Sequence, residues 1–478
     1  MRYILIFALL IATIEAKAQQ SILAATACSK SLSDIYSCAF KTFEFDIQNV
    51  SDPALVAYLR EYSSLMQYTI ANNENNYEKY IKYSDKALDA VEDHVYEYTL
   101  MCNLRLHRCL VEMSKGNLLT GGIQFWKAYQ LYKDAEEEHH SYDGQLKLRG
   151  IFNILLSQIP DKWRSIAGFL GFGTGDLDVG LRQIDTYRKT VSHVPGLHEE
   201  SLLLSFANIF LSHEQHMDDK LSEAMTKSHS PVIAYTYLLS MGRKQQGDKA
   251  DAYIATFFDD IYDKFPLLLH QRAKFALRRL DFEAAKRYAD RFFETYEGVS
   301  CKGDGLLIKA YAHKMEGNET AAKQLAQKCI EHLGRSDVDN RTLADAKRVA
   351  TDDVTLLKSR MLFEYGMYAE AKSLLVGYKP ASKHAVEYQF RLARTEECLG
   401  NKAAAMAHYD RVIAMTANDT RYFGPYSAVY AADIKMASKD KDAARQYLDI
   451  AEKLNDGEFS KELEQRITLG RRVLEKMK

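Results

Sequence analysis

The first segment that could do chemistry is the glycine-rich stretch GFLGFGTGD, which runs from Gly168 to Asp176. Glycine amides can bind a phosphate where a loop follows a strand and opens a helix. No strand pattern precedes Gly168, no Gly-Lys-Ser/Thr closes the stretch, and the GxGxxG pattern is absent. We therefore predict a glycine-rich bend between helices, and leave open whether it is structural or a contact site.

Two histidine-containing stretches could bind a metal: EEEHH, from Glu136 to His140, and HEQH, from His213 to His216. In HEQH the histidines are three residues apart and the glutamate adjoins the first. The HExxH arrangement, which places two ligands on one helical face with a base between them, is therefore absent. We interpret both stretches as solvated helix ends or polar loops, and we predict no metal and no cofactor.

The sequence also lacks the motifs that mark an activated nucleophile. The chain contains no GxSxG and no CxxC motif, and no serine or cysteine lies in a pattern that marks it as activated. We predict that the protein is not an enzyme and has no catalytic residue.

The seven cysteines are too few for a disulfide scaffold, and their odd number leaves one without an intrachain partner. Cys102 and Cys109 lie two helical turns apart, about 10 Å along the axis, which is too far for a bridge. We expect the thiols to serve packing. A bridge among Cys28, Cys38 and the Cys102 region stays open if the compartment is oxidising.

Composition bounds the class of protein. Hydrophobic residues make up 47% and aromatic residues 11% of the 478 residues, which suffices for a packed core and excludes a disordered chain. With 63 basic and 65 acidic residues, the formal net charge is −2. This balance provides no global field to attract nucleic acid, so we predict no nucleic-acid partner.

Residues 1–18 form the pattern of a signal peptide. Arg2 is followed by an apolar run, and Ala16 and Ala18 occupy the small-x-small positions before a cleavage site. The alternative, an uncleaved membrane anchor, needs about 20 apolar residues, and Glu15 and Lys17 interrupt this run. We expect cleavage after Ala18 and a periplasmic or secreted protein that is not integral to a membrane, although peripheral membrane association stays open.

A helical stripe of small and bulky residues recurs along the chain after a short polar turn. Its first clear instance is Ala285, Tyr288, Ala289, Phe292 and Phe293, with increments of three, one, three and one. The other clear instances are Ala322, Leu325, Ala326, Cys329, Ile330; Ala405, His408, Tyr409, Val412, Ile413; and Ala444, Tyr447, Leu448, Ala451. Small residues also precede each turn by seven positions, at Ala273, Ala310, Ala393 and Ala432.

This pattern is typical of tetratricopeptide-like repeats, helix-turn-helix units of about 34 residues. One helix pair cannot bury its apolar face alone, so each unit needs the next to cover it. We predict an all-α solenoid, in which replacing Ala285 or Ala444 by a large residue costs about 1 to 3 kcal/mol. Weaker units use Gly121 with Ala128, Gly366 with Ala371, and Gly247 with Ala252; another lies near the start, at residues 72–88.

The division we expect is a signal peptide at 1–18, N-terminal helical repeats at 19–140, an irregular helical segment at 141–221 and C-terminal repeats at 222–478. The irregular segment carries a Gly-Phe loop. Its aromatic residues and the later stretch RYFGPY could be buried or could contact a partner. The contact candidates are Trp163, Phe169, Phe172, Tyr422, Phe423 and Tyr426. Burial of the first group as a plug in the solenoid is the interpretation we favour.

The irregular segment has the order Phe152-Asn153, then Ser157-x-x-Pro160, then three glycine pairs. These pairs are Gly171-Phe172, Gly175-Asp176 and Gly180-Leu181. Together with GGIQFWKAYQLYKD at 121–134 and the last repeat at 422–467, this order resembles the inclusion-body-clearance family of tetratricopeptide-repeat proteins known from fungi and animals. The similarity spans Tyr77 to the C-terminus. It implies an all-helical, non-enzymatic adaptor for aggregated or mislocalised protein.

That family works in the cytosol and nucleus, whereas residues 1–18 predict export, so only the architecture and a general adaptor role are carried over. Two functions compete. The first is a scaffold outside the cytoplasm that binds a protein partner in a concave groove. The alternative is a component of outer-membrane nutrient acquisition that binds glycan or peptide. A lipidated cysteine and long aromatic loop insertions would favour the alternative. Because neither is convincingly present in the sequence, we prefer the scaffold.

Overall fold

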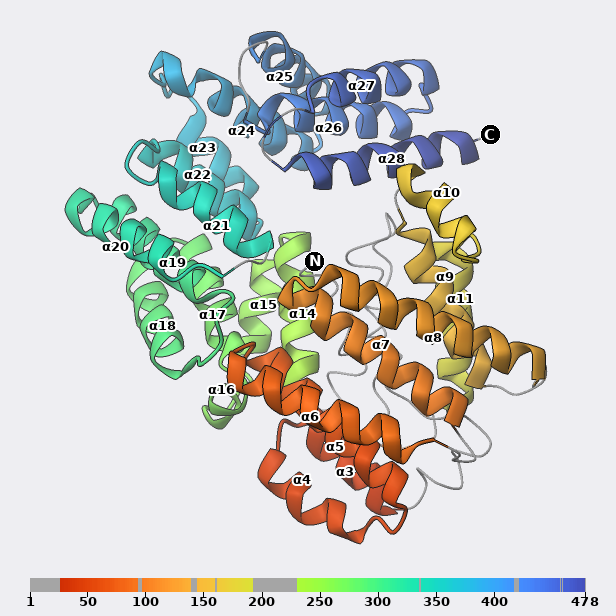
Figure 1. The fold of residues 1–478 in the computed structure, drawn as a ribbon. Helices are drawn as coiled ribbons and strands as arrows, with labels where there is room; N and C mark the ends of the chain where they lie inside the picture. The colour runs from red at the N-terminus through yellow and green to blue at the C-terminus, as the bar shows by residue number, and fades with distance from the viewer. Residues whose placement is uncertain are drawn as a thin grey trace.

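The computed structural model describes residues 26–92, 97–138, 144–159, 161–191, 230–334, 337–416, 421–455, 457 and 459–477. All regular structure in these ranges is helical, and they contain no strand. The predicted all-α fold class is confirmed (Figure 1). The expected signal peptide at 1–18 and the histidines of EEEHH and HEQH lie outside the described residues.

The first half of the chain forms two groups of helices. The N-terminal group is α3 (Thr26–Tyr36), α4 (Phe40–Asp46), η1 (Ile47–Asn49), α5 (Pro53–Ile70), α6 (Glu74–Ala90), α7 (Glu97–Lys115) and α8 (Leu118–Glu138). The irregular segment contributes α9 (Gly144–Ser157), α10 (Asp161–Phe169) and α11 (Leu177–Val191).

The second half begins at residue 230 of the described chain. Its helices are α14 (Pro231–Lys244), α15 (Gly247–Ile254), α16 (Asp260–Lys264), α17 (Leu267–Arg278), α18 (Phe282–Thr295), α19 (Lys302–Met315), α20 (Glu319–Glu331), α21 (Asp337–Arg348), α22 (Val354–Tyr365), α23 (Tyr368–Leu375), η2 (Ser382–His384), α24 (Ala385–Cys398), α25 (Lys402–Met415), α26 (Phe423–Ala437), α27 (Lys441–Lys453) and α28 (Ser460–Lys476).

The recurring polar turn is a two-residue device that ends one helix and starts the next. Gly317 adopts a left-handed φ of 88°, and the backbone N–H of Asn318 then donates to the carbonyl of His313, as at a Schellman helix end. The Asn318 side chain accepts from the N–H of Ala321, 3.1 Å away, and so caps the following helix. The same device recurs with Leu280-Asp281 and Lys439-Asp440.

The small residues of the stripe lie where the paired helices approach. All four alanines before the turns and the first alanine of each clear stripe are fully buried: Ala273, Ala310, Ala393, Ala432, Ala285, Ala322, Ala405 and Ala444. This confirms the tetratricopeptide-like packing. One weaker unit was misregistered, because Ala252 is exposed and Ala250 is buried. Helix α15 begins at Gly247, which places Ala250 on the inward face.

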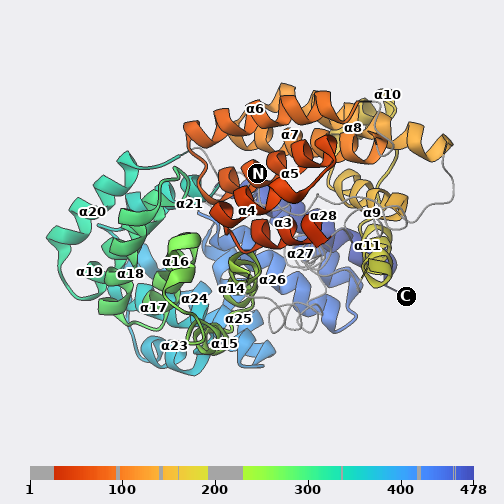
Figure 2. The same cartoon turned by 90° about the horizontal axis from the view of Figure 1, so that it is seen from below.

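Consecutive pairs stack into a solenoid. The first helices α17, α19, α22, α24 and α26 pack one against the next, and α28 packs on α26. Each of the five first helices also contacts the second helix of its own pair. In Figure 1 the N-terminal helices α3–α6 lie in the lower part of the view, α14 and α15 near the centre, α16–α20 at the left and α24–α28 in the upper part. Figure 2 shows α6–α8 on one side of the view and α23–α25 on the other.

The N-terminal group docks on the middle of the solenoid through polar contacts. The Asn72 side chain donates to Ser300 Oγ at 2.8 Å and accepts from the N–H groups of Val299 and Ser300. Ser230 Oγ donates to the carbonyl of Tyr36 at 2.6 Å. These groups are more than 190 residues apart in sequence, so the docking is a tertiary feature.

In the irregular segment, glycines let α9 and α11 touch. A Cβ built on Gly180 would lie 2.7 Å from the carbonyl oxygen of Gly150 and 3.0 Å from the nitrogen of Ile154. A Cβ on Gly175 would lie 2.2 Å from the nitrogen of Ser157. The glycine-rich stretch therefore turns between helices, as predicted, and packs directly on α9.

None of the seven cysteines forms a disulfide, so the bridge left open among Cys28, Cys38 and the Cys102 region is not formed in this structure. None of the described helices combines the length and apolar character needed to span a bilayer.

Candidate functional site

The aromatic residues of the irregular segment divide into two environments. Phe172 packs against Phe125 and Tyr129, with ring centroids 5.4 and 5.0 Å apart, and so joins the core. Phe169, at the end of α10, is 90% exposed. Trp163 belongs to α10, and its side chain lies outside the described residues.

The stretch RYFGPY leads into a helix, because α26 begins at Phe423. Phe423 and Tyr426 are buried, and Tyr422 is half-buried against Phe423 with centroids 4.4 Å apart. These residues belong to a different hydrophobic cluster from Phe172. The two groups of candidates are therefore separate on the molecule.

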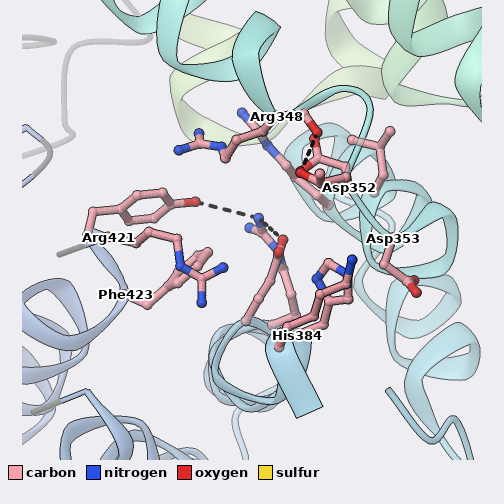
Figure 3. Close-up of a pocket in the computed structure, with 13 residues that line it drawn as sticks. Arg348, Asp352, Asp353, His384, Arg421 and Phe423 are labelled. Carbon is pink, nitrogen blue, oxygen red and sulfur yellow. Dashed lines mark hydrogen bonds and ion pairs between the residues drawn. The ribbon is translucent and has the colours of Figure 1, made fainter. Parts of the chain in front are cut away.

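Tyr422 and Phe423 do line a pocket. This pocket, of about 290 Å³, lies where the α21–α22 turn, η2 with the start of α24, and the start of α26 meet (Figure 3). Its lining residues are Arg348, Thr351, Asp352, Asp353, Leu357, Arg360, Lys383, His384, Glu387, Arg391, Arg421, Tyr422 and Phe423. It is the candidate functional site, and we call it the α21–α26 pocket.

A buried ionic cluster holds α21, one wall of the pocket, against α17 and α19. Asp304 on α19 accepts from His270 Nε2 and pairs with Lys274 Nζ, both at 2.7 Å. Thr342 on α21 donates to the same carboxylate at 3.2 Å. Burial opposes ionisation of Asp304, yet Lys274 and His270 hold its pKa well below the usual value. The cluster therefore fixes the helix that carries Arg348.

The floor of the pocket is an arginine held between two carboxylates. Arg360 on α22 donates to Glu364 at 2.8 Å and to Asp345 at 3.1 Å. Arg278 on α17 pairs with the same Glu364 at 3.2 Å. Burial opposes ionisation of Glu364, but Arg360 and Arg278 lower its pKa to about 2. Glu364 is therefore ionised at neutral pH, and Arg360 has a fixed orientation.

The α24 wall carries a second fixed arginine. Arg391 is 9% exposed and donates to Glu387 at 2.8 Å and to the Tyr422 hydroxyl at 3.5 Å. Asp352 lies across the pocket. Burial, reinforced by Glu387, raises the pKa of Asp352 to about 7. One of the three carboxylates in the pocket is thus only partly ionised at neutral pH.

Among the pocket residues, His384 has a buried ring nitrogen without a hydrogen-bond partner in the described part of the chain. It is 9% exposed, lines the pocket and lies next to the Asp353 side of it in Figure 3. The nitrogen in question is Nδ1. Buried polar atoms of this kind normally have a partner, so Nδ1 is a candidate contact for a ligand.

Beyond the pocket, arginines and aromatic rings continue along the first helices. Arg394 on α24 lies over the ring of Tyr430 on α26, 3.6 Å from the centroid. Arg466 on α28 lies over the same ring at 4.9 Å and pairs with Asp433 at 3.5 Å. We call Arg360, Arg391, Arg394, Tyr430 and Arg466 the inner row.

Sequence reasoning found Tyr422 and Phe423 through their aromatic character and missed every arginine of the inner row. A usable signal existed, because Arg360 precedes Glu364 by four residues and Arg394 precedes Glu397 by three. Such pairs lie on one helical face. From the sequence alone, such pairs are interpreted as solvent-exposed. In the structure, the packing of α22 on α24 places that helical face toward the inside of the solenoid.

The fold defines the class of protein: a tetratricopeptide-like α-solenoid. No protein-family model matches the chain, and no curated protein matches it either.

Among solved structures, the chain is similar to the human IFIT1 dimer with PPP-AAAA at 12% identity and a TM-score of 0.31. That match covers 96% of this chain and 99% of the other. A monomeric IFIT1 mutant with Gppp-AAAA matches with the same identity and coverage and a TM-score of 0.29. The fold assignment rests on the helix pairs themselves.

Proposed function

We propose that this protein is a binding scaffold rather than an enzyme, and that it holds a protein partner along the inner row of its C-terminal repeats. The observation that carries the proposal is the inner row itself. Arginines on α22, α24 and α28 follow the stacked helices, with Tyr430 on α26 between them, and two of these arginines, Arg360 and Arg391, also line the pocket. Arginine and tyrosine, together with tryptophan, are enriched at the energetic centres of protein interfaces.

The charge pattern favours a protein over a polyanion. Arg360 pairs with Asp345 and Glu364, and Arg466 pairs with Asp433. A surface with both signs of charge matches the mixed charges of a polypeptide, whereas a nucleic acid would face these carboxylates with its phosphates.

The finer identity is part of the same proposal. The resemblance of residues 121–134, 144–184 and 422–467 to the inclusion-body-clearance family supports an adaptor for non-native protein, and the predicted signal peptide at 1–18 supports work outside the cytoplasm. Cell fractionation with N-terminal sequencing tests the location. A mature protein that starts at Gln19 in an extracytoplasmic fraction supports it, and an intact Met1 in the cytosol refutes it.

A peptide-library selection tests the scaffold. Random peptides displayed on phage are selected on the purified protein, and their binding is measured by fluorescence anisotropy. Arg394→Gln removes an inner-row cation, and Arg445→Gln is the matched control. Arg445 pairs with Asp442 on α27, and its side chain is 59% exposed.

We expect Arg394→Gln to weaken selected peptides about tenfold or more and Arg445→Gln to leave them unchanged. Equal effects of the two variants would place the peptides elsewhere on the surface. A single-stranded RNA that binds the inner row more tightly than any selected peptide would replace the protein partner by a nucleic acid, because arginine–aromatic pairs can also stack bases.

A further inference from the structure

The lining of the α21–α26 pocket contains more cations than carboxylates. Its cations are Arg348, Arg360, Lys383, Arg391 and Arg421, and its carboxylates are Asp352, Asp353 and Glu387. Asp353 caps α22 through the N–H of Leu356, 3.0 Å away, and also accepts from the Tyr378 hydroxyl. Glu387 is engaged with Arg391. Outside the lining, Asp345 pairs with Arg348 and Arg360, and Glu364 pairs with Arg360. The excess of positive charge therefore belongs to the lining alone, where it favours an anion.

Hydrogen-bond donors converge on the same space. His384 lines the pocket, and its buried Nδ1 atom has no partner among the described residues, so it is a group that a small shift of the ring could offer to a ligand. The Tyr422 hydroxyl accepts from Arg391, so its own proton is available to a second group. Neutral and charged donors around one small cavity suit an oxyanion.

The size of the pocket limits the ligand. At about 290 Å³ it lies at the lower edge of the roughly 300–1,000 Å³ typical of small-molecule sites, so it accommodates a side chain or a chain end. We propose, building on the scaffold function above, that the pocket binds a carboxylate of an acidic peptide segment. The carboxylate comes from an Asp or Glu side chain or from the C-terminus of the partner.

A peptide carboxylate fits better than a nucleic-acid phosphate. A phosphate in the pocket would bring neighbouring phosphates onto Asp353 and Glu387, which line the same cavity. An extended peptide places one carboxylate in the pocket, and its remaining length can follow the inner row toward Arg394 and Tyr430.

The test uses a fluorescein-labelled hexapeptide, Gly-Ser-Gly-Glu-Asp-Asp, in three forms: free C-terminus, amidated C-terminus, and Gln-Asn-Asn in place of the acidic residues. Binding to the full chain is measured by fluorescence anisotropy at low salt. Arg421→Gln and the exposed Lys383→Gln remove pocket cations. Arg445→Gln again serves as the control.

We expect the acidic peptide to bind the wild type, and each pocket variant to weaken it about tenfold, with no effect of Arg445→Gln. Loss on amidation assigns the C-terminal carboxylate as the ligand, and retained binding assigns a side chain. The Gln-Asn-Asn peptide with an amidated end should not bind.

Equal binding of the acidic peptide to wild type, Lys383→Gln and Arg421→Gln overturns the proposal. So does absence of binding to the wild type while library-selected peptides still bind through Arg394. In both cases the scaffold function stands without the pocket. If no peptide of either kind binds and the RNA does, the scaffold function fails as well.

Discussion

Gly180→Ala tests whether α9 and α11 are in backbone contact. Alanine is better than glycine inside a helix by about 1 kcal/mol, so the substitution would stabilise an uncrowded site. At Gly180 the added Cβ would lie 2.7 Å from the Gly150 carbonyl oxygen, 2.7 Å from Ile154 Cγ1 and 3.0 Å from the Ile154 nitrogen. Two of these atoms are backbone, so relief requires the helices to separate, at a cost of about 1 to 3 kcal/mol.

The net expectation for Gly180→Ala, after the gain is subtracted from the cost, is a loss of about 0 to 2 kcal/mol in the free energy of unfolding. Urea unfolding followed by far-ultraviolet circular dichroism measures this loss. Hydrogen exchange should show it first in α9 and α11, because a solenoid unfolds by local units.

Gly122→Ala is the matched control for this prediction. Gly122 lies inside α8, and a Cβ there would meet nothing within 4 Å. This variant should gain up to about 1 kcal/mol. If Gly180→Ala is as stable as Gly122→Ala, the close approach of α9 and α11 is refuted.

Three further predictions use paired variants or pH. Ala405→Leu, at a fully buried position of α25, should lower the free energy of unfolding by about 1 to 3 kcal/mol. Ala403→Leu, on the exposed face of the same helix, should change it by less than about 0.5 kcal/mol. Similar thermal midpoints for the two variants would contradict the repeat packing. Phe172→Ala should lower the free energy of unfolding by about 1 to 3 kcal/mol, and Phe169→Ala should hardly change it. Denaturant titration that finds Phe169→Ala the less stable variant would refute the burial of Phe172 in the solenoid. The raised pKa of Asp352 means that the folded state holds an extra proton between about pH 4 and pH 7, so stability should fall as pH rises through that window. Asp352→Asn should therefore be more stable than wild type by about 1 to 2 kcal/mol at about pH 8, and this difference should fade near pH 5. Thermal melts between these pH values measure it. A difference that does not change with pH would show that Asp352 does not titrate in this range.

The repeats could be predicted because they depend on local rules. Gly317-Asn318 and Lys439-Asp440 end one helix and cap the next within a few residues, and Ala285 and Ala444 are buried because each helix pair needs a cover. The slip at Ala252 has a physical cause: α15 begins at Gly247, and a shift of two positions turns a side chain to the opposite face of a helix.

The pocket could not be predicted, because one sequence does not show which residues of separate helices lie side by side. Tyr422 and Phe423 stood out as aromatic residues, but Arg360, Arg391 and His384 look like ordinary helix residues in the sequence. They lie together because α22, α24 and α26 stack, while Asp304 anchors α21 beside them.

The sequence by itself determined that the chain is helical, that its helices pair and that the pairs stack, since caps, turns and small-residue slots act over one or two helices. Only the tertiary structure decided which charged side chains face one another and where a cavity remains. Those outcomes depend on the rotation of each helix pair relative to the next, and that rotation is set by the packing of many side chains at once.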